Sequence, residues 1–325
     1  MESTQNLMER NAQHSLTLPT ANKNEDNLCM PLAINVVLRY WGEETIIDEA
    51  LKRSKQYDGI EGSIFMEGIE IAESHGYVTY IYKGNLFDLK KRIDQGIPLI
   101  VIMPGIQETV QHATIVSGYS ADERRIFTYI PEPNTEGAFP EDTFVNYWNQ
   151  DGTVSIMIIP TEIRPRITES GLEQRESYRM CFEAERLIQK RNSDNAITLL
   201  KKALTLDRSN SLAWSLLGSV YNELGSDEAI KHFEKSIELN PKFYLSYRGM
   251  GNYYLKRGEY LLAERYYSNA IDLHEYRFGP IYKNRAIARL NMERKQEAKS
   301  DLLRYLEQCP SAKDKTQIET SLNTL

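Results

Sequence analysis

The sequence predicts an α+β domain in its first half and an all-α repeat domain in its second half. A cysteine, Cys29, stands at the start of one predicted helix, and a histidine, His112, opens a predicted strand. Apolar segments of strand length recur up to residue 160, whereas helix-period patterns recur about every 34 residues from residue 176 onward. A chain of 325 residues is long enough for two such domains.

Apolar periodicity and two glycines define the elements of the first domain. Helices are predicted over 31–41, 46–54, 65–75 and 86–95. Gly76 and Gly96 end the last two of these helices, because glycine readily adopts the left-handed conformation of a helix C-terminus. Strands are predicted over 77–82, 99–103, 113–119, 125–130 and 154–159. A helix carrying the cysteine should therefore pack on a sheet carrying the histidine.

The cysteine and the histidine together predict thiol chemistry. A thiol at a helix N-terminus feels the positive end of the helix dipole, which favours the thiolate. A histidine on a neighbouring strand could take the thiol proton and return it to a leaving amine. A lone cysteine among apolar residues is more often a small core residue, so the helix start and the position of His112 carry the catalytic interpretation.

Composition restricts the remaining classes of function. Cys29, Cys181 and Cys309 lie far apart, which argues against a disulfide framework and gives no zinc-ligand spacing. We expect no metal and no cofactor. Residues 1–163 carry 12 basic and 24 acidic side chains, and residues 164–325 carry 27 and 22. The second half is too weakly basic to predict nucleic-acid binding. Neither a signal peptide nor a membrane span is expected, which favours the cytoplasm.

The second half repeats a large-small-aromatic order. Small residues that let two helices approach fall at Ala184, Gly218, Gly251 and Ala286, with spacings of 34, 33 and 35 residues. The clearest unit runs from Ala213 to Pro241. This order resembles the tetratricopeptide repeat, which implies helix pairs stacked into a superhelix with a concave, peptide-binding face. The polar candidates on that face are Asn222, Arg248, Asn252, Lys283 and Asn284.

The first half resembles the C39-like family of papain-fold cysteine peptidases, which includes bacteriocin-leader processing domains. The resemblance spans residues 17–160. It rests on the helix from Cys29 to Tyr40-Trp41-Gly42, on the segment 96–101, and on the His112 strand ending in Gly118-Tyr119. Phe144, Trp148 and a closing apolar strand follow.

This resemblance implies roles for four residues. Cys29 would be the nucleophile and His112 the general base. Glu132, the only acid in the proline-containing segment 129–133, would orient the imidazole. Asn24, or alternatively Asn22, would supply an amide to the oxyanion hole.

Three features depart from the family pattern. Met30 follows the cysteine where the family commonly has glycine, and Lys23 stands where the family has glutamine. If Ile130-Pro131 is the matching dipeptide, the third acid is missing. Two functions therefore remain. The first is a cysteine endopeptidase whose repeats recruit substrate or partner. The second is a weakened pseudopeptidase acting as a peptide- or protein-binding adaptor.

Domain limits follow from these assignments. We expect a flexible N-terminus over residues 1–16, a C39-like papain-fold domain over 17–162 and a linker over 163–175. An all-α tetratricopeptide-repeat superhelix should occupy residues 176–325, with about four units and a capping helix.

Overall fold

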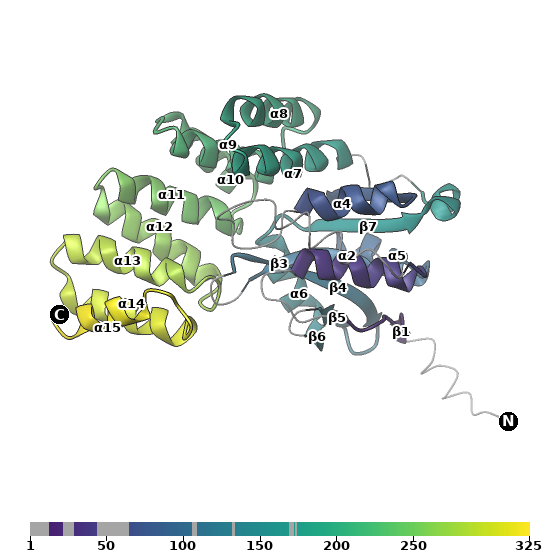
Figure 1. Ribbon diagram of the computed structural model, residues 1–325, viewed down its shortest axis with the longest axis horizontal. Helices are drawn as coiled ribbons and strands as arrows, with labels where there is room; N and C mark the ends of the chain where they lie inside the picture. The colour runs from purple at the N-terminus through teal and green to yellow at the C-terminus, as the bar shows by residue number, and fades with distance from the viewer. Residues whose placement is uncertain are drawn as a thin grey trace. The chain divides into compact units, whose positions relative to one another are not determined.

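The computed structural model describes residues 13–21, 29–43, 65–105, 109–131, 134–168, 172 and 174–325 (Figure 1). The chain divides into two compact units. Unit 1 consists of Met1–Met103 and Ala113–Arg208, and unit 2 consists of Pro104–His112 and Ser209–Leu325. The predicted helix over 46–54 and the residues Lys23, Asn24 and Glu132 lie outside the described part of the chain.

A sheet forms the centre of unit 1, with strand order β2-β7-β3-β4-β5-β6. The strands are β2 (Tyr77–Lys83), β3 (Leu99–Pro104), β4 (Gln111–Ser120), β5 (Arg125–Ile130), β6 (Thr135–Pro140) and β7 (Val154–Pro160). Strand β7 runs antiparallel to both of its neighbours, and β5 runs antiparallel to β4 and β6. All five predicted strands are present.

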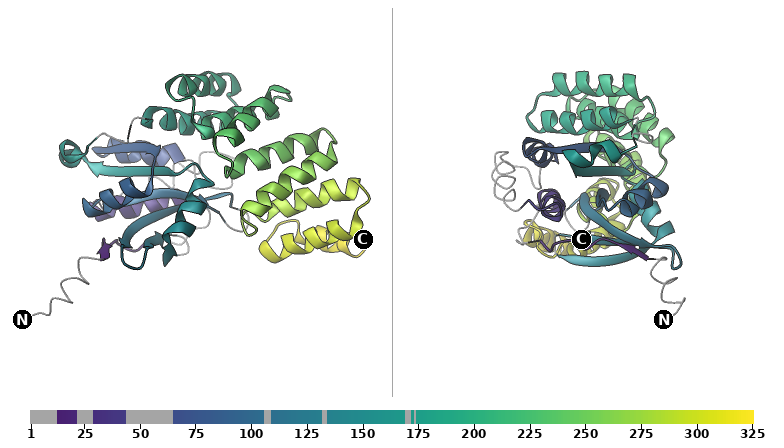
Figure 2. Two further views of the ribbon diagram at one scale, coloured as in Figure 1. Left: turned by 180° about the vertical axis from the view of Figure 1, so that it is seen from behind. Right: turned by 90° about the vertical axis from the view of Figure 1, so that its right-hand side faces the viewer.

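Helices cover both faces of this sheet. Helices α2 (Cys29–Tyr40) and α4 (Phe65–Ser74) lie on one face, and α5 (Leu86–Asp94) and α6 (Glu141–Asn149) lie on the other (Figure 2, right). A 3-10 helix, η1 (Thr161–Arg166), follows β7. Gly76 and Gly96 adopt positive φ angles of 84° and 77°, as predicted for helix ends.

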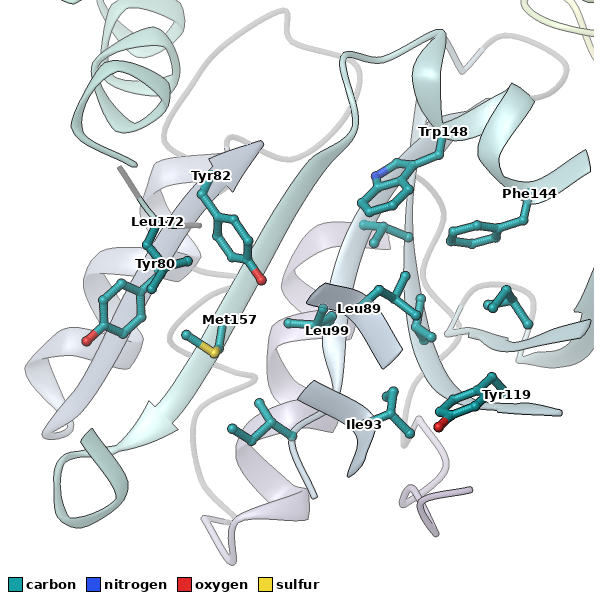
Figure 3. Packing of buried hydrophobic residues seen from close by; sticks show 14 of the residues in the cluster. Tyr80, Tyr82, Leu89, Ile93, Leu99, Tyr119, Phe144, Trp148, Met157 and Leu172 are labelled. Atoms are coloured by element: carbon teal, nitrogen blue, oxygen red, sulfur yellow. The ribbon is translucent and has the colours of Figure 1, made fainter. Parts of the chain in front are cut away.

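Alternation along the strands buries both faces. Met157 and Ile159 of β7 belong to the cluster under α5 and α6, whereas Ile156 and Ile158, also buried, point to the opposite face. Trp148 anchors α6 in this cluster, and its indole Nε1 donates to the Val154 carbonyl at 3.0 Å. Figure 3 shows the cluster, which includes Tyr80, Tyr82, Leu89, Ile93, Leu99, Tyr119, Phe144 and Leu172.

The N-terminal strand β1 (Gln13–Ser15) falls in the segment predicted to be flexible. It pairs antiparallel with β4, where Ser15 lies opposite Gly118. A Cβ on Gly118 would lie 2.4 Å from the His14 carbonyl oxygen, so glycine permits this close pairing. The His14 ring also stacks on Tyr119, and its Nδ1 lies 2.7 Å from Asp94. These contacts hold residues 13–15 on the sheet.

Helices α7 (Arg175–Gln189) and α8 (Ser193–Leu206), which the repeat pattern assigns to the second domain, group with unit 1. Phe182 of α7 stacks on Phe65 of α4 with ring centroids 3.9 Å apart. Arg186 of α7 forms an ion pair with Glu70 of α4 at 2.6 Å. The first repeat helix is therefore packed directly on the α+β layer.

Unit 2 consists mainly of helices in sequential pairs. They are α9 (Ser211–Glu223), α10 (Glu228–Leu239), α11 (Tyr244–Lys256), α12 (Tyr260–Leu273), α13 (Pro280–Asn291), α14 (Lys295–Gln308) and α15 (Lys315–Leu322). A Cβ on Gly218 would lie 2.6 Å from the Phe233 ring, and one on Gly251 would lie 2.5 Å from the Tyr267 ring. The predicted small residues thus let an aromatic ring of the second helix approach the first.

Candidate active site

Cys29 is the first residue of α2, so the helix begins two residues before its predicted start. Its side chain is half-buried, and none of the three cysteines forms a disulfide. The first turn of α2 contains no acidic side chain to oppose the helix dipole. Residues 30–38 are all buried, which fixes α2 against the core of unit 1. The thiol is therefore held at the positive end of a rigid helix.

Met30, the departure next to the cysteine, is 5% exposed. Its side chain belongs to the apolar core, which explains how a large residue is accommodated directly after Cys29.

His112 is the second residue of β4. Its imidazole is half-buried, and the Nε2 atom is shielded from solvent. The residues that follow, Ala113 to Val116, are buried, so the strand holds the histidine at its N-terminal end. The position of His112 at the start of a strand is as predicted. The pairing of Cys29 with His112 stays a prediction.

Tyr129 of β5 joins two loops of unit 1 that the sequence analysis assigns to the site. Its hydroxyl accepts a hydrogen bond from the Ala21 amide and donates one to the Asn134 side-chain oxygen, each at 2.6 Å. Burial raises the pKa of this hydroxyl, so it remains a neutral donor. Ala21 directly precedes the segment that contains Asn24, and Asn134 directly follows the segment that contains Glu132.

Arg39 at the end of α2 adds a further contact to the first of these loops. Its guanidinium Nη1 donates to the Thr20 carbonyl at 2.7 Å. The backbone at residues 20 and 21 is therefore bound to α2 and to β5 at once. Asn24 and Glu132 themselves lie outside the described residues.

In unit 2, the polar candidates of the repeats make different contacts. The Tyr267 hydroxyl donates to the side chain of Asn252 at 2.8 Å. Burial raises the pKa of Tyr267, and a hydrogen bond from Asn284 offsets part of that rise. Arg248 lies over the Phe278 ring at 4.5 Å. Lys283 is separately bound to Asp314 at 2.7 Å. Asn222 is 7% exposed in α9.

Two comparisons with family models decide the relationship of the chain. Residues 13–156 match the model of the Peptidase_C39 like family, and residues 212–243 match a tetratricopeptide repeat. The chain carries a C39-like domain followed by tetratricopeptide repeats. The C39-like match spans β1 to β7, and the repeat match spans α9 and α10.

Solved structures include distant likenesses to both parts. The peptidase domain of Streptococcus ComA, a bi-functional ABC transporter, is 19% identical, with a TM-score of 0.36 over 46% of this chain and 99% of that one. PilF of Pseudomonas aeruginosa is 18% identical, with a TM-score of 0.43 over 46% and 68%. MamA of Desulfovibrio magneticus RS-1 is 16% identical, with a TM-score of 0.42 over 46% and 84%. No curated protein sequence matches the chain.

Two further properties concern the described residues only. Within them, histidine, cysteine and carboxylate side chains form no group of three or more that could hold a metal ion. Among the same residues, no helix combines the length and the apolar character that a membrane span requires.

The sequence analysis did not predict three sets of contacts. They are the hydrogen bonds of Tyr129 to Ala21 and Asn134, the ion pairs between α7 and α4, and the hydrogen bond from buried Arg277 to Val110 in unit 2. Each joins residues far apart in the sequence, so no local pattern marks it. The one sequence signal is that Tyr129 directly precedes Ile130-Pro131, the dipeptide considered for the position of the third acid.

Proposed function

We propose that the protein is a cysteine endopeptidase in which Cys29 is the nucleophile and His112 the general base. The observation that carries the proposal is the position of Cys29 as the first residue of a buried helix whose first turn has no acid. The match of residues 13–156 to the C39-like family supports the same assignment. The repeats would recruit a protein or peptide, which raises the local concentration of substrate at the thiol.

The mechanism follows from these two groups. The Cys29 thiolate attacks the carbonyl carbon of the scissile amide, and the C–N bond breaks as His112 gives its proton to the leaving amine. A thioester links the acyl group to Cys29. His112 then takes a proton from water, the hydroxide attacks the thioester, and the carboxylic acid product and the thiol are released.

Asn24 and Glu132 complete the proposed site. An Asn24 amide would stabilise the oxyanion that forms at the substrate carbonyl, and a Glu132 carboxylate would hold the imidazole in place. The Tyr129 hydroxyl supports this proposal because it binds the backbone beside one loop and a side chain beside the other. We also propose a reducing compartment, the cytoplasm, since the three cysteines form no disulfide.

The repeats supply the proposed binding surface for a partner. Asn252 and Asn284 form hydrogen bonds with Tyr267, and Arg248 lies over the Phe278 ring. These three polar residues would contact a peptide or protein. With these assignments, the C39-like domain would occupy residues 17–162 and the repeats residues 176–325.

The alternative function is an adaptor that binds a peptide without cleaving it. The specific observation in its favour is Lys23, which stands where the family has the glutamine that helps to form the oxyanion hole. Losing one such donor typically lowers the rate about 100- to 1000-fold.

The test is the rate at which iodoacetamide alkylates each cysteine between pH 4 and pH 9, assigned by mass spectrometry. Cys181 and Cys309, at 0% and 2% exposure, are internal references for buried thiols. We expect Cys29 to react fast with an apparent pKa well below that of a free thiol, and His112→Ala to abolish this behaviour. An ordinary Cys29 thiol would contradict the peptidase and favour the adaptor.

A further inference from the structure

Gly105 and Val110, two described residues of the connection between β3 and β4, approach each other closely. The Gly105 amide donates to the Val110 carbonyl at 3.2 Å. A Cβ on Gly105 would lie 2.2 Å from the Thr109 carbonyl oxygen, so only glycine allows this approach. These residues belong to unit 2, together with the repeats from Ser209 onward.

A buried arginine of the repeats binds the same carbonyl. Arg277 is 0% exposed, and its Nε donates to the Val110 oxygen at 2.9 Å. The guanidinium lies over the Tyr244 ring at 4.0 Å, which fixes its plane. The Val110 side chain packs against the core cluster that contains Tyr244 and Tyr267. Both the backbone and the side chain of Val110 are therefore held within unit 2.

Arg277 lies in a long connection between two repeat helices. Residues 274–279 link α12 to α13, whereas only residues 207–210 link α8 to α9 and only residues 240–243 link α10 to α11. The connection that carries Arg277 is thus two residues longer than the other two. A four-residue connection at this place would lack two of the residues between α12 and α13.

We propose that Arg277 is a positioning residue for His112. Val110 precedes His112 by two residues and forms the bend from which β4 starts at Gln111. Fixing the Val110 carbonyl therefore fixes the direction in which β4 starts and in which the imidazole points. The inference rests on the proposed function, since it assigns Arg277 to the alignment of the general base.

The experiment compares the pH profile of Cys29 alkylation by iodoacetamide in the full-length protein and in Arg277→Met. Methionine keeps an unbranched side chain over Tyr244 but removes the donor. We expect the apparent pKa of Cys29 to rise by about one unit and the rate at pH 6 to fall about tenfold, because a misaligned imidazolium stabilises the thiolate less. Arg277→Lys, which keeps the charge, should restore part of the rate.

Arg257→Ala is the matched control. Arg257 also lies over a tyrosine ring, Tyr253 at 3.8 Å, and also donates to a backbone carbonyl, that of Gly225 at 3.2 Å. Gly225 lies in the connection between α9 and α10, and Arg257 directly follows α11, so the loss of Arg257 should leave the profile of Cys29 as in the wild type.

A second variant covers the case in which Arg277→Met does not fold, as judged by circular dichroism. Val110→Ala loosens the same segment and should shift the profile in the same direction by a smaller amount. An unchanged profile in the folded variants, or an equal shift in Arg257→Ala, would overturn the role of Arg277. An ordinary Cys29 thiol in the wild-type protein would instead overturn the proposed function, and the present inference with it.

Discussion

Arg179 donates two parallel hydrogen bonds to Glu73, at 2.6 Å and 2.9 Å. This bidentate pair joins α7, the first helix with a repeat pattern, to α4 of the α+β layer. The Thr79 hydroxyl donates to the same carboxylate. Burial pushes the pKa of Glu73 up, but the hydrogen bonds from Arg179 and Thr79 outweigh it and lower the pKa below its ordinary value.

The Arg179–Glu73 pair should therefore stabilise unit 1 in a pH-dependent way. Its contribution is present above the pKa of an unfolded glutamate and is lost as the pH falls through the lower pKa of folded Glu73. We expect a double-mutant cycle with Arg179→Met and Glu73→Gln to give a coupling free energy of about 1–2 kcal/mol at pH 7 in urea unfolding. The coupling should decrease as the pH falls below the ordinary pKa of glutamate, and a constant value would contradict this account.

Phe182 should contribute more to stability than the ion pair beside it. It is 6% exposed and stacks on Phe65. Phe182→Ala should lower the free energy of unfolding by about 3–5 kcal/mol, because it leaves a cavity between α7 and α4. The matched control is Phe87→Ala, since Phe87 is 80% exposed and its loss should change stability by at most about 0.5 kcal/mol. Equal effects would show that α7 does not depend on this contact.

Glu185 of α7 should have the opposite pH dependence from Glu73. Burial raises the pKa of its carboxyl to about 7, so the folded state disfavours the charged form. Below the pKa of an unfolded glutamate, the carboxyl is protonated in both the folded and the unfolded state and does not lower the free energy of unfolding. Stability is lost as the pH rises through about 7. We expect Glu185→Gln to raise the free energy of unfolding by about 1–2 kcal/mol at pH 8 and to have little effect at pH 4. Thermal unfolding at the two pH values measures the difference.

The sequence predicted those elements whose signal is local. Glycine was predicted correctly at two helix ends and at two close helix contacts. Gly76 and Gly96 adopt positive φ angles, and Gly218 and Gly251 leave room for an aromatic ring. Strand β6 was missed because its residues are mostly exposed and show no apolar alternation. Helix α6 was missed although Phe144 and Trp148 have helical i, i+4 spacing, because only these two apolar anchors stand out in a polar segment.

In the candidate site too, only the residues marked by a local pattern could be predicted. Cys29 and His112 could be predicted because a helix start and a strand start each have a pattern. Tyr129 and Arg277 could not, since their hydrogen bonds reach residues 108 and 167 positions away. Contacts of this range depend on the finished packing, and a single sequence does not encode them in any spacing.

Tyr129→Phe tests whether this hydroxyl organises the proposed site as well as stabilising the fold. The variant keeps the ring and removes the hydroxyl that binds the Ala21 amide and Asn134. We expect a loss of about 1–2 kcal/mol in the free energy of unfolding, because two hydrogen bonds are lost. Peptide cleavage should fall about tenfold or more, because both loops beside the proposed oxyanion and acid positions lose their common anchor.

Tyr77→Phe provides the matched control for this substitution. Tyr77 begins the edge strand β2, where it pairs with Pro160 of β7. Its variant should cleave at the wild-type rate. Cys29 alkylation, measured on the same samples, gives a readout that needs no substrate. If Tyr129→Phe loses stability but keeps both the cleavage rate and the alkylation profile, the hydroxyl is a structural link alone, and the two loops do not depend on it to form the site.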